Sequence, residues 1–132
     1  MKKISNFFAM AAIALFAVNC GGGNTPADIE KSISSQIVAG NYEKAATITI
    51  DNLDTTLSEE DRELYVEFMK KEKESHDAKG GIKSCDIVTE TISEDGLHAI
   101  VETETVFGDG SKDSNTTEYV KKDGVWKISG GK

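Results

Sequence analysis

The apolar pattern of this chain changes once, at Gly80-Gly81, and that change limits the fold more than any other feature. Before the glycine pair, apolar residues recur at every third or fourth position, which is the spacing of amphipathic helices. From Ile82 onwards apolar and polar residues alternate, which is the pattern of half-buried strands. Helices followed by a strand meander predict an α+β domain, in which N-terminal helices pack in a curved four-stranded antiparallel sheet.

Three helices are predicted before the glycine pair. Thr25 and Ser58 each stand three residues before an aspartate, which is the pattern of a capping box at the start of a helix. Leu64 and Phe68 share one apolar face of the third helix. The helices are expected over residues 26–39, 42–53 and 59–78.

Four strands are predicted after the glycine pair. The turns between them are marked by Glu94-Asp95-Gly96, by residues 108–112 and by Asp123-Gly124, of which the last is a strong hairpin signal. The strands are expected over residues 82–93, 97–107, 115–122 and 125–128. No repeat or linker interrupts this part of the chain, so residues 26–132 are expected to form a single domain.

The first 19 residues have the pattern of a secretion signal. Lys2 and Lys3 precede an unbroken apolar run over residues 7–18. As a helix this run would be roughly 18 Å long, which is too short for a hydrocarbon core of about 30 Å. The pattern therefore predicts a cleaved leader and not a membrane span.

Cys20 stands just after this run and is followed by three glycines. A cysteine at the cleavage point is typical of bacterial lipoprotein signals, in which it becomes the lipidated first residue. We therefore expect residues 1–19 to be removed, Cys20 to carry the lipid, and residues 20–25 to form a flexible tether. Ordinary cleavage is the alternative, because Ala17 and Asn19 match either cleavage pattern only loosely. The predicted location is the bacterial cell envelope, and the lack of an acidic run after Cys20 favours its periplasmic side.

The composition is acidic, with a formal net charge of −8, and loss of the two leader lysines would make the mature chain more negative still. Such a surface repels phosphate backbones and anionic lipids, which argues against nucleic acid as a partner. Attachment to the membrane would then depend on acyl chains and not on a basic patch. Cys85 is the one cysteine after Cys20, so stability has to come from the core and not from an internal disulfide.

Four segments carry a resemblance to a known family. They are turns and strand ends at residues 80–84, 92–96, 107–111 and 120–128, and the last contains Val125-Trp126-Lys127-Ile128. Together they resemble a family of small bacterial lipoproteins that carry a domain of unknown function. Its cone-shaped fold is similar to nuclear transport factor 2 and to cystatin-like proteins. The resemblance covers residues 25–128 and implies a helical layer in the hollow of a bent sheet, sometimes with a pocket. It brings no catalytic residues.

Few side chains suggest chemistry. His76 and His98 are far apart in the sequence, so a histidine-based metal site lacks ligands and a surface role is favoured for both. Glu72 lies one turn before His76 and can pair with it. Cys85 is interpreted as a half-buried core thiol and not as a nucleophile. Asp109 begins a segment with oxygen ligands at alternate positions, which a hairpin turn explains better than a calcium loop does. No metal or cofactor is expected.

Two further sets of residues are candidates for a modification and for a pocket. Thr55, in Asp54-Thr55-Thr56, fits a pattern of O-glycosylation acceptors in some bacterial envelopes, although so short a pattern often occurs by chance. Aromatic residues are candidates to line a pocket, with the ordinary core of the domain as the alternative. They are Tyr42, Tyr65, Phe68, Phe107, Tyr119 and Trp126.

Three kinds of function remain open. The best supported is a lipid-anchored, non-catalytic binding or accessory module that presents a pocket to a small molecule, or its outer sheet face to an envelope protein. The alternative is an interaction protein that forms a homodimer through the sheet face, although Glu102 and Glu104 make that face polar. The least supported is an isomerase- or dehydratase-like enzyme, which would need Asp86 to point into the pocket beside Tyr65 or Tyr119.

Overall fold

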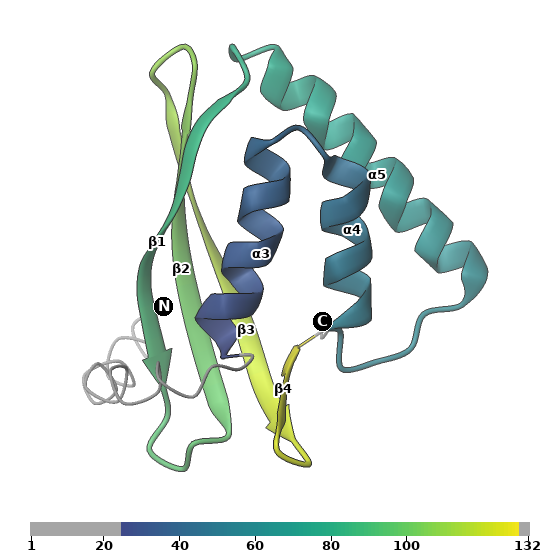
Figure 1. Ribbon diagram of the computed structural model, residues 1–132, viewed down its shortest axis with the longest axis vertical. Coiled ribbons are helices and arrows are strands. Elements are labelled where there is room, and N and C mark those ends of the chain that lie inside the picture. Colours follow the sequence, from purple (N-terminus) through teal and green to yellow (C-terminus); the bar gives the residue numbers. More distant parts are fainter. Residues whose placement is uncertain (1–24, 130–132) are drawn as a thin grey trace.

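The computed structural model describes residues 25–129, so the predicted leader, Cys20 and nearly all of the predicted tether lie outside the described residues. Three helices come first: α3 (Pro26–Val38), α4 (Tyr42–Asp51) and α5 (Glu59–Asp77). Four strands follow: β1 (Ile82–Ile92), β2 (His98–Phe107), β3 (Lys112–Lys122) and β4 (Val125–Ile128). The helices lie on one side of the sheet (Figure 1), which is the predicted α+β arrangement. None of the described helices is long and apolar enough to cross a membrane.

The strands form an antiparallel meander in the order β1-β2-β3-β4. The face of the sheet that is turned toward the helices changes from apolar to polar along the strands, before a last apolar row of Ile82 and Phe107. At the apolar end, one row across the sheet consists of Ile92, Ala99, Tyr119 and Ile128. At the polar end, two successive rows consist of Cys85, Thr105 and Asp113, and of Ile87, Thr103 and Asn115.

The core joins the apolar end of the sheet to the first two helices. Ile29 and Ile33 of α3 and Ala45 and Ala46 of α4 are buried in one cluster with the apolar row of the sheet. α3 lies against the sheet, α4 packs on α3, and α5 packs chiefly on α4 (Figure 1). At the polar end, Thr103 and Thr105 of β2 are buried as well, whereas Asp113 and Asn115 of β3 are exposed.

Hydrogen bonds at the start of α3 explain where the helix begins. Thr25 accepts a bond from the Asp28 N–H at 3.1 Å and donates its own N–H to the Asp28 carboxylate at 3.4 Å, so the predicted capping box is present. Ser58 likewise accepts a backbone bond at the start of α5. Glu90 of β1 accepts a further bond from the Ala27 N–H at 2.9 Å, which ties the first turn of α3 to the sheet.

Two element boundaries differ from the prediction by more than one residue. β3 begins at Lys112, earlier than expected, because Lys112 already pairs with Val106 of β2. The residues there are polar and exposed, so no apolar alternation marks them in the sequence. α4 ends at Asp51, before Leu53, because Leu53 leaves the helix to form an isolated parallel bridge with Ile128.

α5 buries less of its apolar face than the sequence predicts. Leu64 and Phe68 are 62 % and 53 % exposed, whereas Met69 is buried. The reason is the position of the helix: α5 is the outermost layer and packs chiefly on α4, so only part of its surface meets other apolar side chains.

Two glycines bring the end of α5 against the β2–β3 hairpin. The Gly108 N–H donates to the Gly81 carbonyl at 2.8 Å, and the Asp109 N–H donates to the Lys79 carbonyl at 2.9 Å. A Cβ atom on Gly108 would lie 2.3 Å from the Gly80 oxygen, a separation that van der Waals repulsion forbids. Only glycine at position 108 therefore allows the two turns to meet backbone to backbone.

We predict that Gly108→Ala lowers the free energy of unfolding by about 3 kcal/mol, because the added methyl group forces the two turns apart. Gly96→Ala is the matched control, since Gly96 has a positive φ of 73° but a Cβ atom added there would meet nothing within 4 Å. It should cost about 1–2 kcal/mol, the strain of a left-handed conformation alone. Chemical denaturation measures both values, and equal losses would contradict the close contact.

Candidate functional site

A partly open cavity lies between α5, α3 and the polar end of the sheet, with a volume of about 360 Å³. Its walls come from every described element except β4. They mix aromatic rings, aliphatic side chains, hydroxyl groups and carboxylates. The lining residues include Glu30, Ser34, Tyr42, Tyr65, Phe68, Glu72, His76, Cys85, Phe107, Asp113 and Thr117.

Glu30 of α3 forms the first polar group on the cavity wall. The Tyr119 hydroxyl donates to Glu30 Oε1 at 2.6 Å, and the Thr117 hydroxyl donates to Oε2 at 3.4 Å. Burial raises the pKa of the Glu30 carboxyl, and the two hydroxyl bonds only partly oppose that rise. The pKa of Tyr119 is raised too, chiefly by burial and then by the negative charge of Glu30. The phenol therefore keeps its proton and serves Glu30 as a donor.

Tyr42, His76 and Glu72 form the second polar group. The Tyr42 hydroxyl lies 2.7 Å from His76 Nδ1, and His76 Nε2 lies 3.4 Å from Glu72 Oε1. Burial, and then the charges of Asp77 and Glu72, raise the pKa of Tyr42 to about 12. The phenol is thus protonated at neutral pH and can donate to Nδ1, which leaves the Nε2 proton facing Glu72.

Cys85 forms the third polar group, together with two hydroxyls. Its Sγ donates to Ser34 Oγ at 3.5 Å and accepts from Thr105 Oγ1 at 3.4 Å. Both partners are neutral, whereas a reactive thiolate needs cationic neighbours or a helix N-terminus. The half-buried thiol of Cys85 is therefore a polar group of the cavity wall, and its surroundings are not those of a reactive thiolate.

The aromatic residues predicted to line a pocket separate into two groups. Tyr65, Phe68 and Phe107 line the cavity, and the rings of Tyr65 and Phe68 stack with their centres 6.1 Å apart. Tyr119 and Trp126 belong instead to the core cluster at the apolar end of the sheet. Tyr119 reaches the cavity wall only through its hydroxyl bond to Glu30.

Other residues singled out in the sequence lie away from the cavity. Asp86 is exposed and does not line the cavity, so it cannot act there beside Tyr65 or Tyr119. His98 and Thr55 are exposed as well, Thr55 in the loop between α4 and α5.

The segment that superficially resembles a calcium loop is a closed turn. Asp109 Oδ1 accepts bonds from the Ser111 N–H at 2.8 Å and the Ser111 hydroxyl at 2.6 Å, so its oxygen is already used within the hairpin. Among residues 25–129, no group of three or more His, Cys, Asp or Glu side chains is arranged to hold a metal ion.

No pattern in the sequence indicates the contacts that define this site, apart from the pairing of Glu72 with His76. Glu30 meets Tyr119 across 89 positions of the chain, and Tyr42 meets His76 across 34. Glu30 lies one position after Ile29 of the apolar stripe, where a charged residue normally faces solvent. The position of this carboxylate beside the apolar face of the helix is the one feature of the sequence that could have indicated a role for Glu30.

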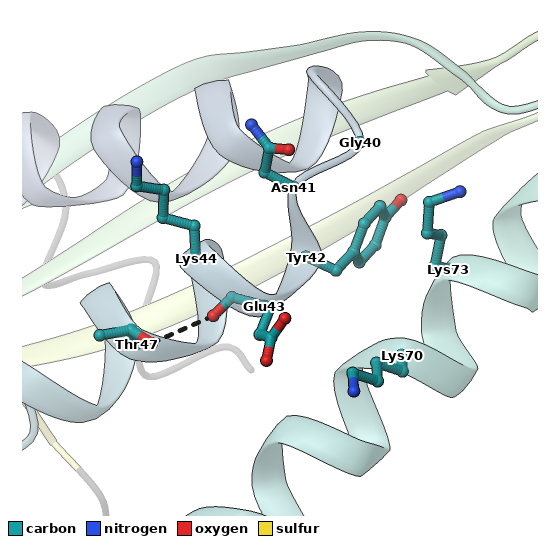
Figure 2. Close-up of a pocket in the computed structure, with 8 residues that line it drawn as sticks. All are labelled: Gly40, Asn41, Tyr42, Glu43, Lys44, Thr47, Lys70 and Lys73. Atoms are coloured by element: carbon teal, nitrogen blue, oxygen red, sulfur yellow. Dashed lines mark hydrogen bonds between the residues drawn. The ribbon is translucent and has the colours of Figure 1, made fainter.

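A second hollow of about 590 Å³ lies outside, where α4 begins and faces α5. Figure 2 shows that Lys44 from α4 and Lys70 and Lys73 from α5 surround it. Lys73 is bound to Asp77, with Nζ 3.0 Å from the carboxylate oxygen. This hollow is more open than the cavity and is edged by long, mobile side-chain types, so the cavity is the better candidate for a specific site.

Comparisons with known proteins agree with the architecture. Residues 18–129 match the family described as "Domain of unknown function (DUF4878)". A crystal structure from Campylobacter jejuni, of a protein described as a candidate NTF2-like transpeptidase, matches with a TM-score of 0.62 and 19% identity, over 80% of this chain and 98% of that one. At that identity the match shows the fold alone, and the expected likeness to nuclear transport factor 2 is confirmed.

A second structure, the intermembrane space region of the chloroplast protein ARC6, is 16% identical with a TM-score of 0.32, over 77% of this chain and 85% of that one. A TM-score this low does not indicate a shared fold. A comparison with curated proteins found no match.

We predict that Glu30→Gln becomes more stable relative to the wild type as the pH rises from about 4.5, the ordinary pKa of the carboxyl, toward neutrality. The folded-state pKa of Glu30 is raised, so the neutral form is the one the fold favours, and that contribution is lost as the pH rises through the folded pKa. Glutamine keeps an oxygen to accept the Tyr119 bond and cannot ionise.

Glu118→Gln is the matched control, because Glu118 is exposed and lies between two residues that face the helices. Urea denaturation of the three proteins across this pH range gives the free energies of unfolding. A difference between Glu30→Gln and the wild type that stays constant with pH would contradict the prediction.

Proposed function

Because the chain belongs to the family of the domain of unknown function DUF4878, we propose that it is a lipid-anchored, non-catalytic binding module of the bacterial cell envelope. Its cavity would take up a small molecule. The observation that carries this proposal is the partly open cavity of about 360 Å³ between α3, α5 and the polar end of the sheet.

The size and lining of the cavity support binding. Ligand pockets for small molecules typically measure about 300–1,000 Å³ and combine apolar or aromatic walls with a few fixed polar groups. Here Tyr65, Phe68 and Phe107 supply aromatic surface, whereas Glu30 and His76 are held in position by hydrogen bonds to tyrosines. Fixed polar groups of this kind orient a ligand without being reorganised when it arrives.

The chemistry of the lining supports a binding role over catalysis. The cavity-lining thiol has hydroxyl partners, and the pKa of about 12 at Tyr42 is far from that of a general base at neutral pH. The carboxylate that an isomerase-like mechanism would have used, Asp86, is exposed outside the cavity. These features favour a module that holds a molecule over one that transforms it.

The anchor is supported by the sequence before the domain. The short apolar run over residues 7–18 and the cysteine at position 20 are typical of a lipoprotein signal. α3 begins at Pro26, so few residues separate the proposed lipid from the domain. The module would therefore work close to the membrane surface, on the periplasmic side.

Native mass spectrometry of the full-length protein, extracted in mild detergent from its own membranes, tests the proposal. The expected mass is that of the chain cleaved before Cys20, with acyl chains and a stoichiometric small molecule. Thr117→Trp should abolish the bound mass, because the indole projects from β3 into the cavity, where a strand position tolerates an aromatic residue.

Glu118→Trp is the control one position along, on the exposed side of the same strand, and should keep the bound mass. Circular dichroism confirms that both variants are folded. An acylated protein without any added mass would contradict the binding role, and the same spectra would show whether it forms a dimer instead. A chain without acyl groups would contradict the anchor.

A further inference from the structure

The charged side chains that line the cavity are all acidic, and His76 supplies the one imidazole ring among its lining residues. Glu30, Glu72 and Asp113 contribute to its walls, and no lysine or arginine is among the lining residues of the described chain. We propose that the ligand carries a positively charged nitrogen, as an organic ammonium ion attached to an apolar body. This inference rests on the proposed binding function and specifies the class of ligand.

Glu30 is the residue that the ligand's charge would meet. The hydrogen-bond partners of its carboxylate are the neutral hydroxyls of Tyr119 and Thr117, and within residues 25–129 it forms no ion pair. An ionised carboxylate that is largely removed from water and lacks an opposite charge is unfavourable in a folded protein. An ammonium group in the cavity would supply that charge and a charge-assisted hydrogen bond.

The aromatic walls suit the same kind of ligand. The faces of aromatic rings attract cations, most strongly where water is excluded. One cavity-lining ring already takes part in such a contact, since the ammonium group of Lys79, which does not itself line the cavity, lies 4.6 Å from the centre of the Phe107 ring. The stacked pair of Tyr65 and Phe68 offers further ring surface inside the cavity. A carboxylate next to aromatic rings favours an amine with an apolar body and disfavours an anion.

The cation is expected to be organic and not a metal ion. Calcium and magnesium take six or more oxygen ligands, and zinc takes four ligands at short distances. No group of three potential ligands for a metal occurs in the part of the chain that the structure describes. The net charge of −8 adds an attractive field for any cation that approaches the protein.

Isothermal titration with three probes of one shape tests the inference: phenylpropylamine, phenylpropanol and phenylpropanoate. They share an apolar body and differ in charge, being positive, neutral and negative at neutral pH. The full-length protein in mild detergent should bind the amine at least about tenfold more tightly than the alcohol, and the carboxylate most weakly. Each titration is also run on detergent alone, so that uptake of probe by micelles is subtracted.

Glu30→Gln separates charge from shape. It should weaken binding of the amine about tenfold and leave binding of the alcohol unchanged, whereas Glu118→Gln should change neither. Equal affinity for amine and alcohol, or an amine affinity that Glu30→Gln does not alter, would overturn the ammonium inference and leave the cavity as a binding site of another specificity. If none of the three probes binds at millimolar concentration, the ammonium inference fails, whereas the proposed binding function is contradicted only by a native mass spectrum without bound mass.

Discussion

The rest of the structure depends on the uneven inner face of the sheet. Where the face is apolar, around Ala99 and Tyr119, burial against α3 and α4 supplies the hydrophobic free energy that holds the domain together. Where it is polar, the hydroxyl groups of Thr103 and Thr105 are buried as well, and such groups are costly to bury unless each finds a partner. The helices cover the first region with apolar side chains, whereas a cavity remains between them and the second region.

This division also explains why the three polar groups of the cavity have partners of their own. Within the described residues, no fully buried side-chain nitrogen or oxygen lacks a hydrogen-bond partner. Glu30 with Tyr119, Tyr42 with His76, and Cys85 with Ser34 each connect a helix to the sheet or to another helix. Hydrogen bonds between polar lining groups of different elements fix the positions of the cavity walls, which contacts between apolar side chains would do less specifically.

The sequence predicted the elements well and the site poorly, for a physical reason. Helix caps such as Thr25 and alternation such as that of β2 are local, so they can be recognised from neighbouring residues alone. The resemblance in the turns and strand ends correctly implied the cone-shaped arrangement. By contrast, the exposure of Leu64 and the hydrogen bond between Glu30 and Tyr119 depend on how α5 and α3 pack against segments that are distant in the sequence. No local pattern contains that information.

The backbone contact between the turns at Gly80 and Gly108 determines how a molecule could reach the cavity. Two backbone hydrogen bonds fasten the C-terminal end of α5 to the β2–β3 hairpin, so the walls cannot separate there without breaking them. The remainder of α5 packs chiefly on α4. Within residues 25–129, no hydrogen bond joins α5 to β3. The bonded turns therefore close the cavity at this end, whereas Phe68 of α5 and Asp113 of β3 line it and are both exposed, so it meets solvent between these two elements. A molecule that enters on that side leaves the sheet and its apolar core in place.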